Sequence, residues 1–98
     1  MYKSRFANKD IDELFEAILK LETVEECYRF FEDLCTVKEV IDMSQRLKVA
    51  KMLNKKIPYQ KIVDETKAST ATISRVNKSL IYGAEGYHLI IKKINQTK

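Results

Sequence analysis

The chain has 98 residues, with 18 Lys and Arg against 14 Asp and Glu, and a net charge of +4 at pH 7. Only two glycines and one proline are present, which leaves little room for hairpins or long linkers. We therefore expect one all-α domain over residues 1–98, built from about six helices. A lone chain of this size buries little more than about 60% of its unfolded surface, so pairing of two copies would enlarge the core.

The net charge divides unevenly along the chain. Residues 1–43 hold 6 basic and 11 acidic side chains, a net charge of −5, whereas residues 44–98 hold 12 and 3, a net charge of +9. A strongly cationic half is what phosphate neutralisation requires, because counterion release supplies most of the sequence-independent affinity for nucleic acid. We expect double-stranded DNA as the partner of this half, with the acidic half turned away from it.

Enzymatic chemistry has little support in the sequence. His88 is the only histidine, and no Ser or Cys nucleophile has a credible base and orienting acid. No glycine-rich phosphate loop is present, so we expect a protein that is not an enzyme. Cys27 and Cys35 have no histidine partners at ligand spacing, which predicts reduced core residues rather than a metal site.

The start of the chain, Met-Tyr-Lys-Ser-Arg, is polar and basic. No apolar run of signal-peptide or membrane-span length follows it. We therefore expect a cytoplasmic protein with no membrane association.

Residues 1–56 predict helices that serve dimerisation. Asn8 can cap a helix through about Leu21, and Thr23 opens a capping box that starts a second helix. Their apolar stripes are Ile11, Leu14, Phe15, Ile18 and Leu21, then Val24, Cys27, Tyr28, Phe30, Phe31 and Leu34. The second stripe is broader than one small domain needs, so we interpret it as a partner-chain interface; the alternative is an intrachain core.

A third helical region runs from the capping box at Thr36 to about Asn54. Its expected core face is Val40, Ile41, Leu47, Ala50 and Leu53. Two interpretations stay open, because the region is either one helix or two, with Ser44 capping the second. Its polar side and end carry Lys48, Lys51, Lys55 and Lys56, either a solvated face or phosphate contacts.

Residues 57–80 predict a helix-turn-helix. Pro58 suits a helix start, and Ser69 can cap a second helix by accepting from the amide of Ala71 or Thr72. The expected inward-facing residues are Ile62, Val63 and Thr66, followed by Ala68 in the turn, then Ile73, Val76 and Leu80 at helical spacing. The opposite face carries Thr70, Ala71, Ser74, Asn77 and Lys78, which are mostly short enough for base edges to come close in a major groove.

The runs Ala71–Arg75 and Asn77–Leu80 resemble the DNA-reading segment of the tryptophan repressor family. The resemblance implies an intertwined homodimer whose second helices enter successive major grooves about 34 Å apart. Such a protein would be a transcriptional repressor that binds a near-palindromic operator. The family's groove-facing positions match Thr70, Ala71 and Ser74, and its backbone or base contacts match Gln60, Lys61 and Thr72.

The resemblance also implies an effector pocket. Two arginines matching Arg46 and Arg75 would stack on an indole, and a serine matching Ser79 would receive the amino group. The family has glycine after the helix arginine, whereas this chain has Val76, whose side chain would project into the ligand's space. We therefore expect the arginines to contact phosphates or acids such as Glu65; L-tryptophan or a related small molecule is the alternative.

Two further departures from the family lie near the turn. Lys67 replaces the glycine common there, which would strain a left-handed residue by about 1 kcal/mol. Asp64 is an acid where the family is often basic, and Lys61 or Lys67 could pair with it.

The chain ends in a bend and a last helix. The bend, residues 81–86, holds both glycines, and the helix over residues 86–94 has Leu89, Ile90 and Ile94 as its apolar face. The resemblance implies that this helix packs on the partner chain. A second hypothesis stays open: a helical protein-interaction module without DNA binding, which would use the rings of Tyr28, Phe30 and Phe31.

Overall fold

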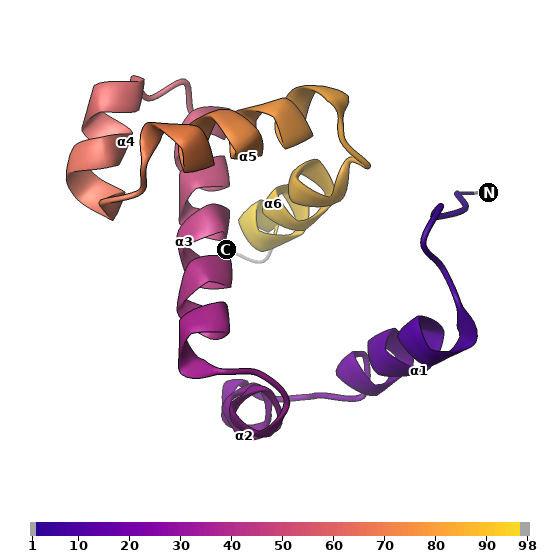
Figure 1. Cartoon of the computed structure of the whole chain (residues 1–98). Helices are drawn as coiled ribbons and strands as arrows, with labels where there is room; N and C mark the ends of the chain where they lie inside the picture. The colour runs from indigo at the N-terminus through magenta and orange to yellow at the C-terminus, as the bar shows by residue number, and fades with distance from the viewer. Residues whose placement is uncertain (1, 97–98) are drawn as a thin grey trace. The chain divides into compact units, whose positions relative to one another are not determined.

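A computed structural model describes residues 2–96, which form six α-helices and no strand (Figure 1). In chain order these are α1 (Lys9–Ile18), α2 (Val24–Leu34), α3 (Val37–Asn54), α4 (Tyr59–Thr66), α5 (Thr70–Tyr82) and α6 (Gly86–Gln96). The all-α prediction is confirmed. None of these helices combines the length and apolar content that a membrane span requires. The chain forms two compact units, Met1–Val37 and Lys38–Lys98.

Both helices of the first unit begin at the predicted caps. Asn8 Oδ1 accepts from the amide of Ile11 at 2.8 Å, and Thr23 Oγ1 accepts from the amide of Glu26 at 3.0 Å. These bonds satisfy donors that the helix itself leaves without partners. The first helix is shorter than predicted: it ends at Ile18, and the following residues form tighter turns instead of reaching Leu21 as helix.

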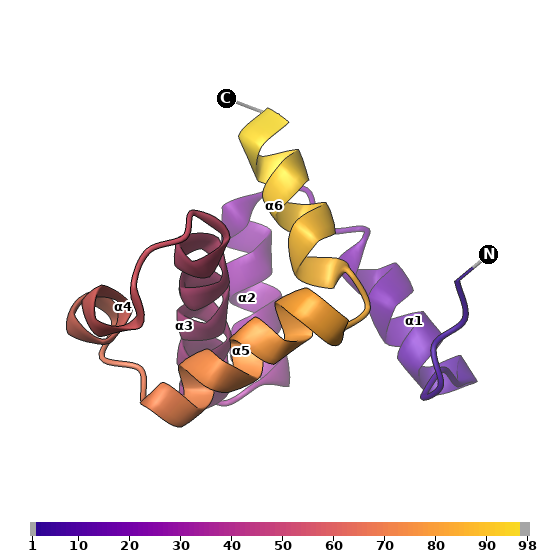
Figure 2. The same ribbon diagram turned by 90° about the horizontal axis from the view of Figure 1, so that it is seen from above.

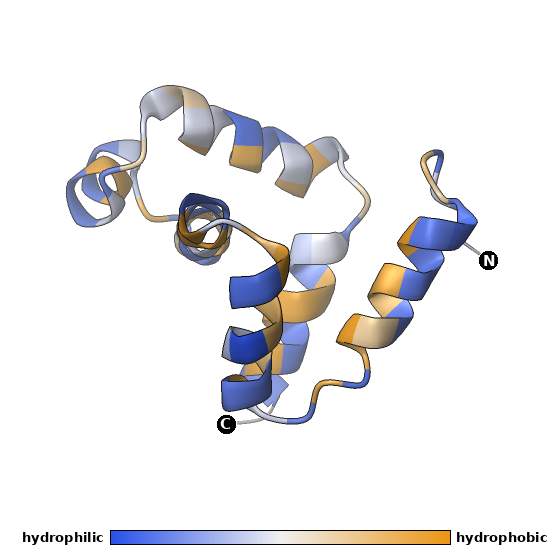
Figure 3. Ribbon diagram, turned by 60° about the horizontal axis from the view of Figure 1, so that its bottom comes forward, coloured by the Kyte–Doolittle hydropathy of each residue, from blue (hydrophilic) through white to orange (hydrophobic). Residues whose placement is uncertain are grey.

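The first unit buries none of the residues of α1 or α2. Each helix has an apolar side and a polar side (Figure 3), yet Phe15 is 51% exposed and Tyr28 is 64% exposed. The alternative of an intrachain core for these stripes has no support within the first unit. Both cysteines are free, as predicted, but they are not core residues within the first unit: Cys27 is exposed and Cys35 only half-buried.

The third helical region is one continuous helix, α3. Ser44 Oγ donates to the carbonyl of Ile41 at 2.7 Å, so this serine bonds within the helix and does not cap a new one. The predicted core face is partly wrong, because Ile41 is 58% exposed. The buried residues of α3 lie in its C-terminal half: Val49, Ala50, Met52 and Leu53.

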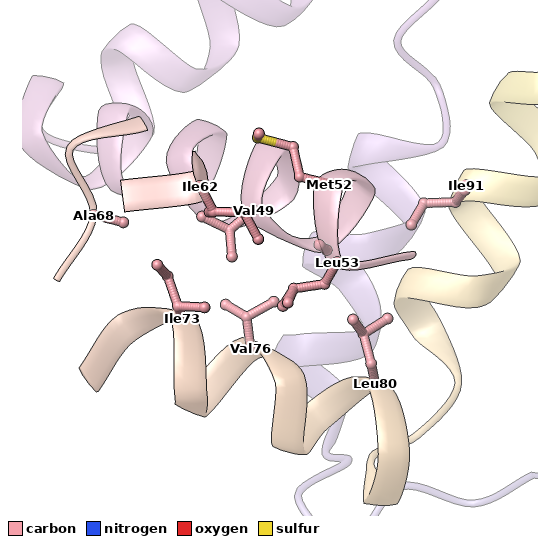
Figure 4. Packing of buried hydrophobic residues seen from close by; sticks show 10 residues of the cluster. Val49, Met52, Leu53, Ile62, Ala68, Ile73, Val76, Leu80 and Ile91 are labelled. Carbon is pink, nitrogen blue, oxygen red and sulfur yellow. The ribbon is translucent and has the colours of Figure 1, made fainter. Parts of the chain in front are cut away.

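The second unit is organised around this C-terminal half of α3. In both views α5 crosses it, with α4 and α6 on opposite sides (Figures 1 and 2). The apolar side chains meet between α3 and α5 (Figure 4). The core consists of Val49, Ala50, Met52, Leu53, Ile62, Ala68, Ile73, Val76, Leu80 and Ile91. The prediction that α5 buries a stripe at three and four spacing is confirmed by Ile73, Val76 and Leu80.

Glycine is required where α5 ends. The helix continues two residues past the predicted Leu80 and stops at Gly83, whose amide donates to the carbonyl of Ser79 at 2.9 Å. A Cβ atom on Gly83 would lie 2.3 Å from that same carbonyl oxygen. Any other residue would therefore push the backbone apart at this point.

The last helix buries a residue that lies outside its predicted apolar face. Ile91 is in the core, whereas Leu89 and Ile90 are exposed. His88 Nε2 lies 2.8 Å from the carbonyl oxygen of Leu80, and this bond links α6 to the end of α5. We infer that this link, with the packing of Tyr87 against the core, sets the rotation that turns Ile91 inward.

Truncation of the α5 stripe should destabilise the fold strongly. Ile73 is fully buried, so Ile73→Ala should lower the free energy of unfolding by about 2–5 kcal/mol through the smaller transfer energy and the cavity left behind. Lys78→Ala on the exposed side of the same helix should change it by less than about 0.5 kcal/mol. Urea denaturation of both variants measures the difference, and equal stabilities would contradict the burial of this stripe.

Candidate nucleic-acid interface

The helix-turn-helix is formed by α4, a short turn and α5. Pro58 lies just before α4 with φ −61° and ψ 148°, the extended backbone that a helix start needs. Lys67 ends α4 in the left-handed region, at φ 61° and ψ 13°, and its amide donates to the carbonyl of Val63. The prediction that a lysine occupies a left-handed turn position is confirmed, and it costs about 1 kcal/mol relative to glycine.

Ser69 holds the first turn of α5 in place. Its Oγ accepts from the amide of Thr72 at 3.1 Å, and Ser69 Oγ also lies 3.1 Å from Thr72 Oγ1, within hydrogen-bond distance. The predicted cap is confirmed, with Thr72 as its partner. Thr72 is half-buried, and its hydroxyl is within hydrogen-bond distance of the Ser69 hydroxyl at the start of α5.

The remaining residues of α5 divide into two faces. Opposite the buried stripe, the helix exposes Thr70, Ala71, Ser74 and Lys78, with Asn77 half-buried beside them. Their side chains, Lys78 apart, are short, so a partner could approach the α5 backbone closely. The structure therefore leaves this predicted groove-facing surface, which we call the α5 open face, free of intrachain cover.

The two candidate residues of α4, Gln60 and Lys61, are also exposed. Gln60 Nε2 donates to Asp64 Oδ1 at 3.0 Å. Pairing of Asp64 with Lys61 or Lys67 is therefore not what the structure shows, because the neighbouring amide one turn away occupies the carboxylate. Lys61 keeps its ammonium group in solvent.

Gln45 is a positioning residue that the sequence pattern did not reveal. Its Nε2 donates to the carbonyl of Thr66 at 3.1 Å, which joins α3 to the end of α4. Thr66 Oγ1 in turn donates to the carbonyl of Ile62 at 2.7 Å and accepts from the amide of Ala68 at 3.1 Å. A signal was present, since Gln45 lies one turn before buried Val49, a polar residue in register with an apolar stripe.

The three residues that the resemblance assigns to an effector pocket differ in exposure, and Val76 beside two of them is buried. Val76 is only 1% exposed and lies between Ile73 and Leu80 on the side of α5 that faces α3 (Figure 4). Arg75 and Ser79 are exposed, and Arg46 is half-buried. No ion pair to Glu65 forms within the described residues, so acid pairing of the arginines has no support.

Cations cluster in the second unit. The segment over residues 48–78 carries exposed lysines on its helices and in both loops: Lys48, Lys51, Lys55, Lys56, Lys61, Lys67 and Lys78. The ion pairs Arg29–Glu25 and Lys38–Asp42 lie before this segment. This segment of the chain therefore combines solvated positive charge with a short-chained helix face, the combination typical of DNA-binding modules.

The sequence model of the Trp repressor protein matches residues 9–95. The chain belongs to the Trp repressor family. The uncharacterized protein YerC of Bacillus subtilis (strain 168) is 47% identical over 98 residues, which is all of this chain and 94% of YerC. Membership confirms the resemblance and makes the chain a member of a family of helix-turn-helix regulators.

Two solved structures share the fold. One is a candidate Trp repressor from Staphylococcus aureus, with a TM-score of 0.89 and 52% identity, covering 93% of this chain and 91% of that chain. The other is a TrpR-like protein from Eubacterium eligens ATCC 27750, with a TM-score of 0.86 and 49% identity, covering 88% and 89%. The Trp-repressor-like arrangement of helices is thus confirmed.

Removal of the Gln45 bond should loosen the helix-turn-helix. In Gln45→Met the side chain keeps its length but cannot donate, which leaves the half-buried carbonyl of Thr66 without this partner and should cost about 1 kcal/mol of stability. The neighbouring Ser44→Ala removes only an exposed bond within α3 and should stay within about 0.5 kcal/mol of wild type. Thermal and urea unfolding measure the stabilities of both variants. Equal stabilities of Gln45→Met and Ser44→Ala would show that Gln45 does not brace the turn.

Proposed function

We propose that the protein is a DNA-binding transcriptional repressor that acts as a homodimer on a near-palindromic operator. The observation that carries the proposal is the α5 open face, which is polar, short-chained and exposed within the cationic part of the chain. Family membership supports the regulatory role. Two copies of α5, one from each chain, would enter successive major grooves about 34 Å apart.

Within this proposal the candidate residues divide by the chemistry of their side chains. Thr70, Ala71 and Ser74 contact base edges, because a hydroxyl can donate to or accept from base groups and the alanine methyl suits a thymine methyl. Gln60, Lys61, Thr72, Asn77 and Lys78 contact the sugar-phosphate backbone or flanking bases. Such backbone contacts set the position of the helix on the duplex, and base contacts set the sequence preference.

The homodimer is proposed from the apolar surface that one chain leaves exposed. No residue of α1 or α2 is buried, and large apolar side chains of both helices, together with Leu89 and Ile90 of α6, are exposed. A monomeric soluble protein rarely leaves this much apolar surface in contact with water. A second copy that covers these helices would complete the core and set the spacing of the two α5 helices.

The same surface keeps the second hypothesis open. A helical protein-interaction module without DNA binding would use the rings of Tyr28, Phe30 and Phe31, of which Tyr28 is exposed and the two phenylalanines are half-buried. Phe30 and Phe31 are in edge-to-face contact with ring centroids 5.7 Å apart. In the DNA-binding proposal these rings are covered by the second copy; in the module they bind a different polypeptide.

Tryptophan has no place in the proposed mechanism. The side chain of Val76 fills the space on α5 where the family's glycine would leave room for an indole, and it contributes to the core that positions the helix. Arg46 and Arg75 then act as phosphate contacts. Ser79, exposed beside them, needs no effector amino group.

Neutral substitution of the cations near α5 should weaken DNA binding. Each of Lys61→Ala and Arg75→Ala should reduce the salt slope by about 0.9 for every phosphate that the variant no longer neutralises, hence about twice that in a symmetric dimer. Lys20→Ala, an exposed lysine of the first unit, is the control. Affinities for operator fragments selected from genomic DNA, measured by fluorescence anisotropy at several salt concentrations, test this; wild-type affinity and slope in both variants would count against the interface.

A charged substitution on the apolar side of α2 should show whether this side forms a homodimer or binds a different polypeptide. Wild type should sediment as a dimer, and Tyr28→Asp should shift it toward monomer and weaken operator binding, because each α5 would then bind alone. Glu32→Asp, an exposed acid on the same helix, should change neither. Analytical ultracentrifugation gives the mass; a stable wild-type monomer with no affinity for DNA would favour the interaction module.

A further inference from the structure

Three described residues other than glycine adopt positive φ: Lys56 at 64°, Lys67 at 61° and Glu85 at 68°. Neither of the chain's two glycines has a positive φ. In the left-handed region the Cβ atom of an L-residue crowds the backbone, and glycine relieves that strain. Each of the three positions is therefore occupied by a side chain that costs stability where glycine would not.

Lys67 is the one of the three that lies inside the helix-turn-helix. The residues on both sides of it are fixed: Thr66 receives the Gln45 bond on its carbonyl, and Ala68 is 3% exposed in the core. The amide of Lys67 itself closes α4 by donating to Val63. The backbone at Lys67 has no freedom to leave the left-handed region, and its side chain starts from a rigid point.

The ammonium group of Lys67 is not used to stabilise the turn through an ion pair. The ion pairs of the described residues are Arg29–Glu25 and Lys38–Asp42, Asp64 accepts from Gln60, and Lys67 is exposed. Lysine at this point does lie near the C-terminus of α4, where the helix dipole favours a cation and offsets part of the strain. A lysine within the last helical turn of α4 would interact with the helix dipole equally well and would not need a left-handed backbone.

We propose that Lys67 contacts a DNA backbone phosphate at the edge of the groove that α5 enters, and that this contact explains a lysine at a position suited to glycine. The inference rests on the proposed function. Lys67 lies two residues before Ser69, the cap of α5. If the N-terminal part of α5 enters the major groove, Lys67 comes beside the phosphates that border the groove. A long, flexible cation can reach them from a fixed Cα.

Substitution of Lys67 by glycine should raise the stability of the protein and weaken its binding to DNA. Lys67→Gly should raise the melting temperature by about 4–8 °C through relief of about 1 kcal/mol of strain. It should weaken DNA binding about three- to tenfold at moderate salt and reduce the salt slope by about 0.9 per chain, equally for operator and random DNA. Lys67→Arg keeps a cation at the same strained position and should retain wild-type affinity and slope.

Glu85→Gly is the matched control. It relieves the same kind of strain in the α5–α6 connection and removes no cation, so it should raise the melting temperature similarly without a smaller salt slope. If wild type binds DNA and Lys67→Gly keeps the wild-type slope, the phosphate contact is refuted while the proposed function stands. If wild type has no affinity for any duplex at low salt, both are refuted.

Discussion

Packing of α5 on the C-terminal half of α3 is the interaction on which the rest of the second unit depends. Ile73, Val76 and Leu80 are buried against residues such as Val49 and Leu53. Because these side chains occupy one side of the helix, the residues between them are turned outward. Burial of the stripe thus creates the open face, and the rigidity of a close-packed core holds that face at a defined angle to the turn.

Polar contacts around α4 also fix the helix-turn-helix in place, through hydrogen bonds instead of apolar packing. A helix of eight residues is too short to be stable by itself, and α4 is held by Ile62 in the core, by Gln45 across from α3 and by the left-handed closure at Lys67. These constraints leave the turn little freedom. The strain at Lys67 persists because the neighbouring residues are anchored on both sides, and its function, in our proposal, is to place a charge where glycine would place none.

The first unit presents the opposite situation, well-capped helices without a core. The hydrogen bonds at Asn8 and Thr23 define where α1 and α2 start, but their apolar sides remain in solvent. Helices of this length gain most of their stability from tertiary packing rather than from propensity. The exposed apolar sides support our proposal that a second copy of the chain covers these helices.

Local patterns in the sequence determined the helix starts, the buried stripe of α5 and the family, since caps and three-and-four spacing depend on residues only a few positions apart. The open face followed from the same spacing. Tertiary structure alone decided that α3 is continuous, that Ile91 rather than Leu89 or Ile90 is buried, and that Gln45 braces the turn. Those outcomes depend on which side of a helix meets a distant segment, and that is set by the summed packing of several helices. Local spacing could mark Gln45 as a polar residue in register with an apolar stripe, but it could not identify the carbonyl of Thr66 as its partner.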